Sequence, residues 1–150
     1  MVKVGDVAPD FTAEADNGME FALGSMRGRK VVLYFYPRDN TPGCTQEACD
    51  FRDLSPALPD KNAVVVGVST DSARSHQSFK SKYALPFTLV ADPERKIVNQ
   101  YGVWVEKKNY GRSYMGVART TFVIDEAGIV ERMFENVRVK GHAGAVIGSL

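Results

Sequence analysis

The 150-residue sequence predicts an α/β fold, a three-layer α/β/α sandwich with a mixed central sheet and an N-terminal β-hairpin. Two apolar runs, at residues 31–36 and Ala63–Ser69, have the unbroken hydrophobic pattern of strands that are buried on both faces. A helical pattern over residues 44–58 separates them, as in a right-handed β-α-β crossover. These observations predict two parallel strands side by side in the sheet.

Turn and capping residues on either side of that unit predict the remaining elements. Asp16-Asn17-Gly18 is a strong tight-turn signal and predicts a hairpin within residues 8–22. The later elements expected are a helix capped by Asp71 or Ser72 that ends near Tyr83, a strand over residues 86–90, a helix from Asp92-Pro93 to about Tyr101, an irregular stretch over residues 102–118, a hairpin of residues 120–124 and 129–135 around Glu126-Ala127-Gly128, and a helix over residues 141–148. No repeat or linker divides the chain, so residues 1–150 are expected to form one domain.

Composition excludes several classes of function. The net charge is +1, from 19 basic and 18 acidic residues without a basic block, so nucleic-acid and membrane-surface binding lack electrostatic support. The longest apolar run is far shorter than the roughly 20 residues that span a bilayer, and the N-terminus lacks a signal-like apolar region. We therefore expect a cytoplasmic protein. Two cysteines are too few for a disulfide framework, which favours a catalytic or redox use.

Both cysteines lie in the segment that follows the first apolar run. Thr41 is a good N-cap residue, and Pro42 suits the first position of a helix. Cys44 then falls in the first turn, where unpaired N–H groups and the positive end of the helix dipole favour the thiolate, the nucleophilic form of cysteine. The pattern therefore predicts a reactive thiol at Cys44.

Cys49 lies five residues after Cys44 and is expected to be held apart from it. On one α-helix the two residues are about 140° apart around the axis, with Cα atoms roughly 8–9 Å apart. A disulfide requires a Cα separation of less than about 7 Å, so it can form only if the first turns unwind. Cys44 shares a stripe with Ala48 and Phe51, whereas Cys49 falls nearer the polar side of the helix.

The residues around Cys44 resemble a known family. Pro37-x-x-x-Thr41-x-x-Cys44 resembles the active-site motif of the peroxiredoxins, and the longer stretch Thr-Pro-Gly-Cys-Thr-x-Glu-Ala-Cys-x-Phe-Arg is similar to the bacterioferritin-comigratory (PrxQ) subfamily. The similarity extends over essentially the whole chain, through Ala8-Pro9-Asp10-Phe11, Val66-Gly67-Val68-Ser69-Thr70-Asp71, Tyr101-Gly102-Val103-Trp104 and Arg119-Thr120-Thr121-Phe122-Val123-Ile124-Asp125. The resemblance implies a thioredoxin-like fold and thiol peroxidase activity.

The resemblance also implies roles for the two cysteines. Cys44 would be the peroxidatic cysteine and Cys49 the resolving cysteine of an atypical two-cysteine enzyme, with Pro37 shielding the pocket from water. The substrates implied are hydrogen peroxide and organic hydroperoxides, reduced without metal or organic cofactor. Thioredoxin or a glutaredoxin-like thiol donor would be the reductant. The family tends towards monomers, with a weak dimer as the alternative.

Four further residues are assigned to the same chemistry. The backbone N–H of Gly43 and the hydroxyl of Thr41 are suited to hold the peroxide, because charge moves from sulfur to the leaving oxygen. Arg119 would supply a positive charge that cannot be lost by deprotonation. Glu47, one turn from Cys44, would orient Arg119 by a charge-assisted hydrogen bond.

Two other function classes remain open. A dithiol-disulfide oxidoreductase would use the same fold but normally carries Cys-x-x-Cys, which the spacing of Cys44 and Cys49 does not match. A redox-sensing interaction protein would use a disulfide of Cys44 and Cys49 as a switch without turnover. Steady peroxide consumption with a thiol donor separates the enzyme from the sensor.

The remaining candidate residues are assigned to structure. His76 and His142 fit no zinc spacing, and both are expected on the surface. Arg52 is expected either to form a surface ion pair or to support Glu47. The residues expected in a solvated loop are Lys107, Lys108 and Arg112, and those expected in packing or the pocket wall are Trp104, Tyr34, Tyr36, Tyr101, Tyr110 and Tyr114.

Overall fold

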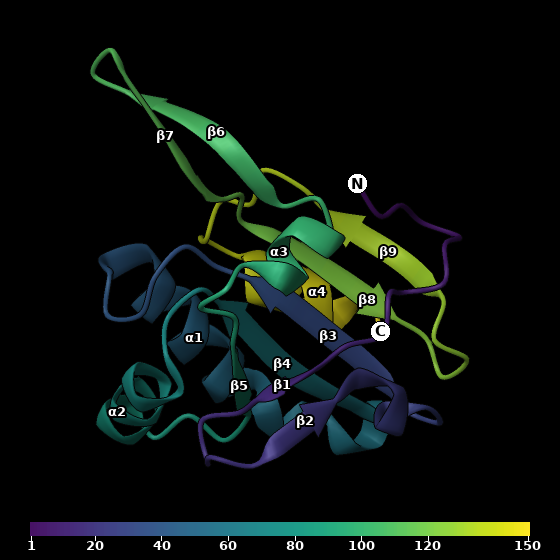
Figure 1. Cartoon of the computed structure of the whole chain (residues 1–150). Helices are drawn as coiled ribbons and strands as arrows, with labels where there is room; N and C mark the ends of the chain where they lie inside the picture. Colours follow the sequence, from purple (N-terminus) through teal and green to yellow (C-terminus); the bar gives the residue numbers. More distant parts are fainter.

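A five-stranded mixed sheet, in the order β5-β4-β3-β8-β9, forms the centre of the computed structural model, which describes residues 1–150 (Figure 1). The strands are β3 (Lys30–Phe35), β4 (Ala63–Ser69), β5 (Thr88–Ala91), β8 (Thr120–Ile124) and β9 (Val130–Phe134). Strands β3, β4 and β5 are parallel, whereas β8 is antiparallel to β3 and β9 is antiparallel to β8. The predicted mixed sheet is confirmed.

Strand β3 is the middle strand and is buried on both faces. Val31, Leu33 and Phe35 join one apolar cluster, and Val32 and Tyr34 join the other. Because successive side chains of a strand point to opposite faces, a strand covered on both sides needs apolar residues at every position. The unbroken apolar run in the sequence is the consequence of this central position.

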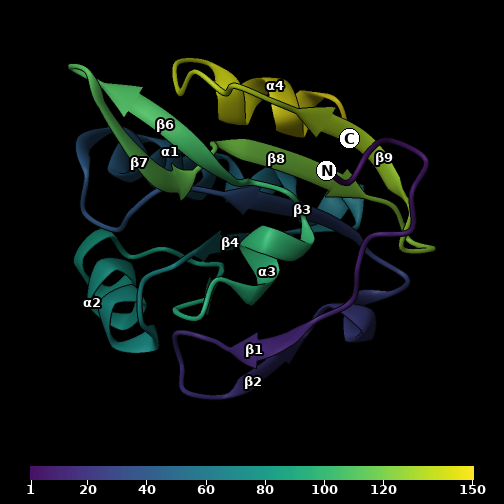
Figure 2. The ribbon, with the colours of Figure 1, turned by 45° about the horizontal axis from the view of Figure 1, so that its top comes forward.

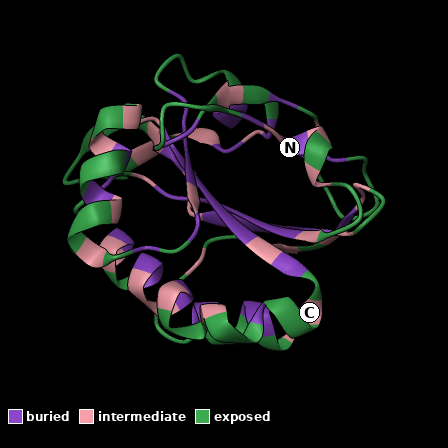
Figure 3. Cartoon of the chain, turned by 90° about the horizontal axis from the view of Figure 1, so that it is seen from below, coloured by how far each residue is buried: buried purple, intermediate pink, exposed green.

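Helices cover one face of the sheet, and a short helix with the hairpin of β1 (Thr12–Glu14) and β2 (Glu20–Ala22) covers the other. Figure 2 shows the C-terminal helix, in yellow, on the side of the sheet opposite to β1 and β2. The first face carries α1 (Pro42–Leu54), α2 (Ala73–Tyr83) and α4 (His142–Gly148), whose inner residues join a cluster of 17 buried residues. The second face carries α3 (Lys96–Gln100) and the hairpin, which join a cluster of 20 buried residues. Figure 3 shows the buried strands between outer surfaces that are mostly exposed. The predicted three layers are confirmed.

The N-terminal hairpin is also confirmed. Strand β1 (Thr12–Glu14) pairs with the antiparallel strand β2 (Glu20–Ala22) across the turn at Asp16-Asn17-Gly18. Gly18 has φ +78°, a left-handed conformation that glycine adopts without steric cost. Asp16 is buried, and its carboxylate accepts hydrogen bonds from the Lys80 ammonium of α2 and the Leu89 N–H of β5. These contacts attach the hairpin to the sheet.

Helix α1 begins as the sequence predicts but ends earlier than residue 58. Thr41 is the N-cap residue and Pro42 occupies the first helical position. The Thr41 hydroxyl, however, donates to the carbonyl of Arg38 at 2.9 Å and makes no capping bond. The regular helix stops at Leu54, because Pro56 has no N–H to continue the ladder. Short 3₁₀ helices, Ser55–Ala57 and Pro59–Lys61, follow it, and a third lies at Leu23–Met26.

The first residues of two other helices can be compared with the starts predicted from their capping residues. Ser72 caps α2, accepting a hydrogen bond from the Ser75 N–H at 3.1 Å, as expected. Helix α3 begins at Lys96, so the prediction of a start at Asp92-Pro93 is wrong. The Asp92 carboxylate instead accepts from the N–H of Val98, and the intervening turn requires Arg95 in a left-handed conformation with φ +61°. The side chain therefore caps the helix from a distance.

The expectation of an irregular stretch over residues 102–118 is wrong. Strands β6 (Trp104–Asn109) and β7 (Arg112–Val117) form an antiparallel hairpin that projects from the body of the molecule (Figure 1). Tyr110 and Gly111 both have positive φ, +51° and +76°, which is the signature of a tight two-residue hairpin turn. Because much of the hairpin is solvated on both faces, its sequence lacks the alternation that usually identifies a strand.

No helix of the chain is both long and apolar enough to span a bilayer.

Candidate active site

Cys44 lies in the first turn of α1 and faces the core between the helices and the sheet. Its side chain is buried, in the same cluster as Ala48 and Phe51 of the predicted stripe. The first N–H groups of a helix have no partner within it, so those of Gly43 and Cys44 remain for a ligand. A nucleophile at this point is surrounded by hydrogen-bond donors and by the positive end of the helix dipole.

Arg119 joins Cys44 to Glu47. It lies in the short link between β7 and β8, and its Nη2 donates to Cys44 Sγ at 3.3 Å. Its Nη1 donates to Glu47 Oε1 at 2.6 Å, so one guanidinium contacts both groups. Burial alone would lower the pKa of Arg119, but the adjacent Glu47 and Cys44 raise it above the ordinary value. The structure thus brings together three residues that are 75 positions apart at most.

Glu47 is an acid with one free oxygen inside the protein. The side chain is buried, and Oε2 has no hydrogen-bond partner. Burial raises the pKa of Glu47 to about 7, and Arg119 opposes that shift. The carboxyl group can therefore exchange a proton near neutral pH, within one turn of the thiol.

His142 lies behind Glu47, so its predicted surface position is wrong. Its Nε2 is 2.8 Å from Thr121 Oγ1 and 3.9 Å from Glu47 Oε2. Burial lowers the pKa of His142 to about 4, and the charge on Arg119 contributes to the shift. A signal was available in the sequence, since His142 and Val146 are four residues apart on the inner stripe of the last helix.

The other predicted site residues make no hydrogen bond to the Cys44 sulfur. Thr41 donates its hydroxyl to the carbonyl of Arg38, so that hydroxyl must rotate before it can donate to sulfur or peroxide. Gly43 leaves room for Arg119, because a Cβ atom there would lie 3.3 Å from Nη2. Pro37 is half-buried in the turn before α1. Their catalytic roles remain predictions.

Cys49 is half-buried on the same helix, and both thiols are free. Helix α1 is continuous from Pro42 to Leu54, so the two cysteines have the helical separation that prevents a disulfide. Arg52 does not support Glu47. It forms an ion pair with Asp53 at 2.9 Å and donates to the carbonyl of Tyr83.

Comparison with known proteins identifies the family to which the chain belongs. A model of the AhpC/TSA family matches residues 4–133. A putative peroxiredoxin bcp of Coxiella burnetii is 49% identical over 149 residues, with 99% of both chains covered. The chain belongs to the AhpC/TSA family of peroxiredoxins.

The relatives place the chain among the Bcp/PrxQ peroxiredoxins. Peroxiredoxin Bcp of Bacillus subtilis is 44% identical, with 99% of this chain and 95% of that one covered. A PrxQ mutant of Xylella fastidiosa superposes with a TM-score of 0.94 at 33% identity, covering 99% and 95%. The bacterioferritin comigratory protein of Xanthomonas campestris, described for its alkyl peroxide reduction activity, superposes at 0.91 with 34% identity and the same coverage. The thioredoxin-like fold and the thiol peroxidase activity are those predicted.

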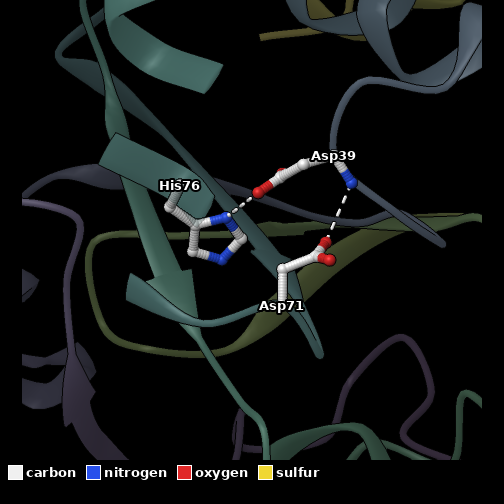
Figure 4. Close-up of side chains that lie close together, drawn as sticks. All are labelled: Asp39, Asp71 and His76. Atoms are coloured by element: carbon white, nitrogen blue, oxygen red, sulfur yellow. Dashed lines mark hydrogen bonds and ion pairs between the residues drawn. The ribbon is translucent and has the colours of Figure 1, made fainter. Parts of the chain in front are cut away.

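This peroxiredoxin contains a second polar cluster, formed by the buried Asp39 and His76 and the half-buried Asp71 (Figure 4). His76 is fully buried, so its predicted surface position is also wrong. The ligand-type atoms of the three residues lie within 4.8 Å of one another. Hydrogen bonds account for this proximity, since His76 Nδ1 is 2.7 Å from Asp39 Oδ2 and the Asp39 N–H donates to Asp71 Oδ2 at 2.8 Å.

The β6–β7 hairpin carries Lys107, whose pKa is affected by burial and by the charges of both Arg119 and Cys44. Burial lowers the pKa of Lys107, and the charge on Arg119 adds to that effect. Trp104 at the base of the hairpin is half-buried, with the Arg95 guanidinium 5.3 Å from its ring centroid.

The expected packing role is correct for Tyr34, Tyr36 and Tyr101, which are buried, and wrong for Tyr110 and Tyr114, which are 98% and 50% exposed.

Proposed function

We propose that this peroxiredoxin reduces hydrogen peroxide and alkyl hydroperoxides through Cys44. The observation that carries the proposal is the contact of the Arg119 guanidinium with Cys44 Sγ, at 3.3 Å, in the first turn of α1. The alkyl hydroperoxide substrate is supported by the activity named for the Xanthomonas campestris relative. A fixed cation beside the sulfur favours the thiolate and can stabilise the charge that develops on the leaving oxygen.

The first step is attack by the Cys44 thiolate on one peroxide oxygen. The sulfur–oxygen bond forms, the O–O bond breaks, and the other oxygen leaves as hydroxide or alkoxide. That oxygen takes up a proton and departs as water or alcohol, while Cys44 becomes a sulfenic acid. The N–H groups of Gly43 and Cys44, together with Arg119, are the donors that would hold the peroxide in line.

The second step is attack by the Cys49 thiol on the sulfenic sulfur. Water leaves, and a Cys44–Cys49 disulfide forms. The helical separation of the two residues requires that the first turns of α1 unwind for this step. A thioredoxin or glutaredoxin-like dithiol would then reduce the disulfide. We further propose that residues 1–150 act as one cytoplasmic domain, as a monomer or a weak dimer.

Intact mass of the reduced protein after one equivalent of hydrogen peroxide tests both cysteines. Wild type should lose two hydrogens, Cys49→Ser should gain one oxygen, and Cys44→Ser should not react rapidly. A Cys44→Ser variant that reacts as fast as wild type would exclude Cys44 as the peroxidatic residue. Steady consumption of peroxide with a thiol donor distinguishes the enzyme from a redox switch without turnover.

A further inference from the structure

Hydrogen bonds tie the turn that precedes α1 to α2 and to the link before α2 through a single residue, Asp39. Asn40 has φ +61°, and Pro37 has no N–H to donate. The hydrogen bonds that connect residues 37–40 to other elements are all made by Asp39. Since Thr41 and Cys44 follow directly, the position of this turn fixes where the peroxidatic helix begins.

Asp39 is held by four hydrogen bonds from three parts of the chain: the residue after β3, the link between β4 and α2, and α2 itself. Its N–H donates to Asp71 Oδ2 at 2.8 Å, and its Oδ1 accepts from the hydroxyl of Tyr36, at the end of β3, at 2.6 Å. Its Oδ2 accepts from the Ser75 hydroxyl at 2.8 Å and lies 2.7 Å from His76 Nδ1. Both Ser75 and His76 belong to α2. We name these five residues the Asp39 anchor.

His76 is itself fixed at its second nitrogen. Nε2 lies 2.9 Å from the carbonyl oxygen of Val90 in β5, and a carbonyl can only accept, so Nε2 carries a proton. The imidazole therefore ties the turn before α1 to the interior of the sheet. His76 and Asp39 are both buried, and a hydrogen bond lost there is not replaced by water.

We propose that Asp39 and His76 are positioning residues that keep the start of α1 in its folded, peroxide-reactive conformation and so set how often it unwinds for Cys49. The inference rests on the proposed roles of Cys44 and Cys49. Unwinding moves the chain between the turn and Cys44, and the Asp39 anchor opposes that movement. The folded conformation reacts with peroxide, whereas the unwound one forms the disulfide.

The two conformations compete for the Cys44 sulfenic acid. In the unwound form it condenses with the Cys49 thiol, releasing water. In the folded form a second peroxide oxidises it to sulfinic acid, and the peroxide leaves as water or alcohol. A weaker Asp39 anchor should therefore slow the first oxidation and reduce the fraction of sulfinic acid. Loss of a residue that only supports the fold would not both slow the first oxidation and reduce the fraction of sulfinic acid.

The test compares His76→Gln and Tyr36→Phe with a control that removes a different side-chain contact of α2, the one between Lys80 and Asp16. Tyr36→Phe removes the hydroxyl that donates to Asp39 Oδ1 at 2.6 Å and lies 3.4 Å from His76 Nδ1, and it is the milder change because His76 keeps its contacts with Asp39 and Val90. Asp16→Asn breaks the Asp16–Lys80 pair, whose nitrogen–oxygen distance is 2.8 Å, and loosens α2 from the hairpin without touching the turn. For each protein, rapid mixing gives the rate constant of Cys44 oxidation, and intact mass gives the ratio of disulfide to sulfinic acid in excess hydrogen peroxide.

The expected result in His76→Gln is a roughly tenfold higher ratio of disulfide to sulfinic acid, the population shift from one lost buried hydrogen bond, with a smaller fall in the oxidation rate because the folded conformation stays in the majority. Tyr36→Phe should change both in the same direction and by less, and Asp16→Asn should match wild type. A His76→Gln protein that matches Asp16→Asn, or gives more sulfinic acid than wild type, overturns the proposal. If Cys44 of wild type is not oxidised at all, forming neither the disulfide nor the sulfinic acid, the proposed function has failed instead.

Discussion

Two buried polar clusters lie on either side of the start of α1, and they differ in how completely their hydrogen bonds are satisfied. Both oxygens of Asp39 have short partners, and the opposing His76 is bonded at both nitrogens. Glu47, by contrast, uses one oxygen for Arg119 and leaves the other without a partner. The Asp39 cluster therefore fixes the backbone, whereas the Glu47 cluster leaves one carboxyl oxygen free to accept a proton beside the thiol.

The largest effect expected from this difference is on stability. Asp39→Ala removes the shared acceptor of three side-chain donors, two of them buried, and should lower the free energy of unfolding by about 3–5 kcal/mol. Glu47→Gln keeps an oxygen for Arg119 and removes a carboxyl whose second oxygen is already unpaired, so it should change stability by less than about 1 kcal/mol. Urea unfolding at pH 7 measures both, and equal losses would contradict the contrast.

Removing the guanidinium should have the next largest effect, this time on catalysis. Arg119→Ala takes away the only side-chain donor to Cys44 Sγ, and the rate constant of Cys44 oxidation should fall roughly 10²–10³-fold. Arg119→Lys should recover only part of that loss, because an ammonium lacks the planar fork that reaches sulfur and Glu47 together. Stopped-flow oxidation by hydrogen peroxide measures the rates. Full activity in Arg119→Lys would show that charge alone suffices.

A smaller effect is expected from Gly43→Ala. The new Cβ would lie 3.3 Å from Arg119 Nη2, and the guanidinium must give way by a few tenths of an ångström. We expect the oxidation rate to fall about tenfold with little change in thermal stability, because catalysis depends on geometry more steeply than folding does. The melting temperature and the oxidation rate should be measured on the same sample. Loss of both together would indicate a folding defect.

The smallest expected effect is the pH dependence of wild-type stability, because Glu47 and His142 contribute slopes of opposite sign. The pKa of Glu47 is raised to about 7, so the stability that it contributes is present below pH 4.5 and is lost as pH rises towards 7. The pKa of His142 is lowered to about 4, so its contribution is present above pH 6.5 and is lost as pH falls towards 4. The two slopes have opposite signs between pH 4.5 and 6.5.

Variants at these positions should reveal each slope. Glu47→Gln should become more stable, relative to wild type, as pH rises from 4.5 to 6.5, because only the His142 dependence remains. His142→Gln should show the reverse trend. Urea unfolding at half-unit pH steps provides the measurement. Parallel curves for all three proteins would show that neither group titrates as its burial implies.

The apolar pattern determined more of the fold than of the site. Both central strands and the helix between them follow from local runs, because a strand buried on both faces must be apolar throughout. The β6–β7 hairpin was not predicted because it is largely solvated and its sequence does not alternate between apolar and polar residues. His76 and His142 were placed on the surface because a histidine shows its burial only through partners that are distant in sequence, such as Val90 and Thr121.

The sequence by itself determined the α/β class, the Thr41-Pro42 start of a helix with Cys44 in its first turn, and the separation of Cys44 from Cys49. Each of these depends on residues within a few turns of one another. Only the tertiary structure decided that Arg119 reaches both Cys44 and Glu47 and that Asp39 is bonded to α2. These contacts join positions 37 to 75 residues apart, and the packing of helices against the sheet, which no local pattern encodes, brings them together.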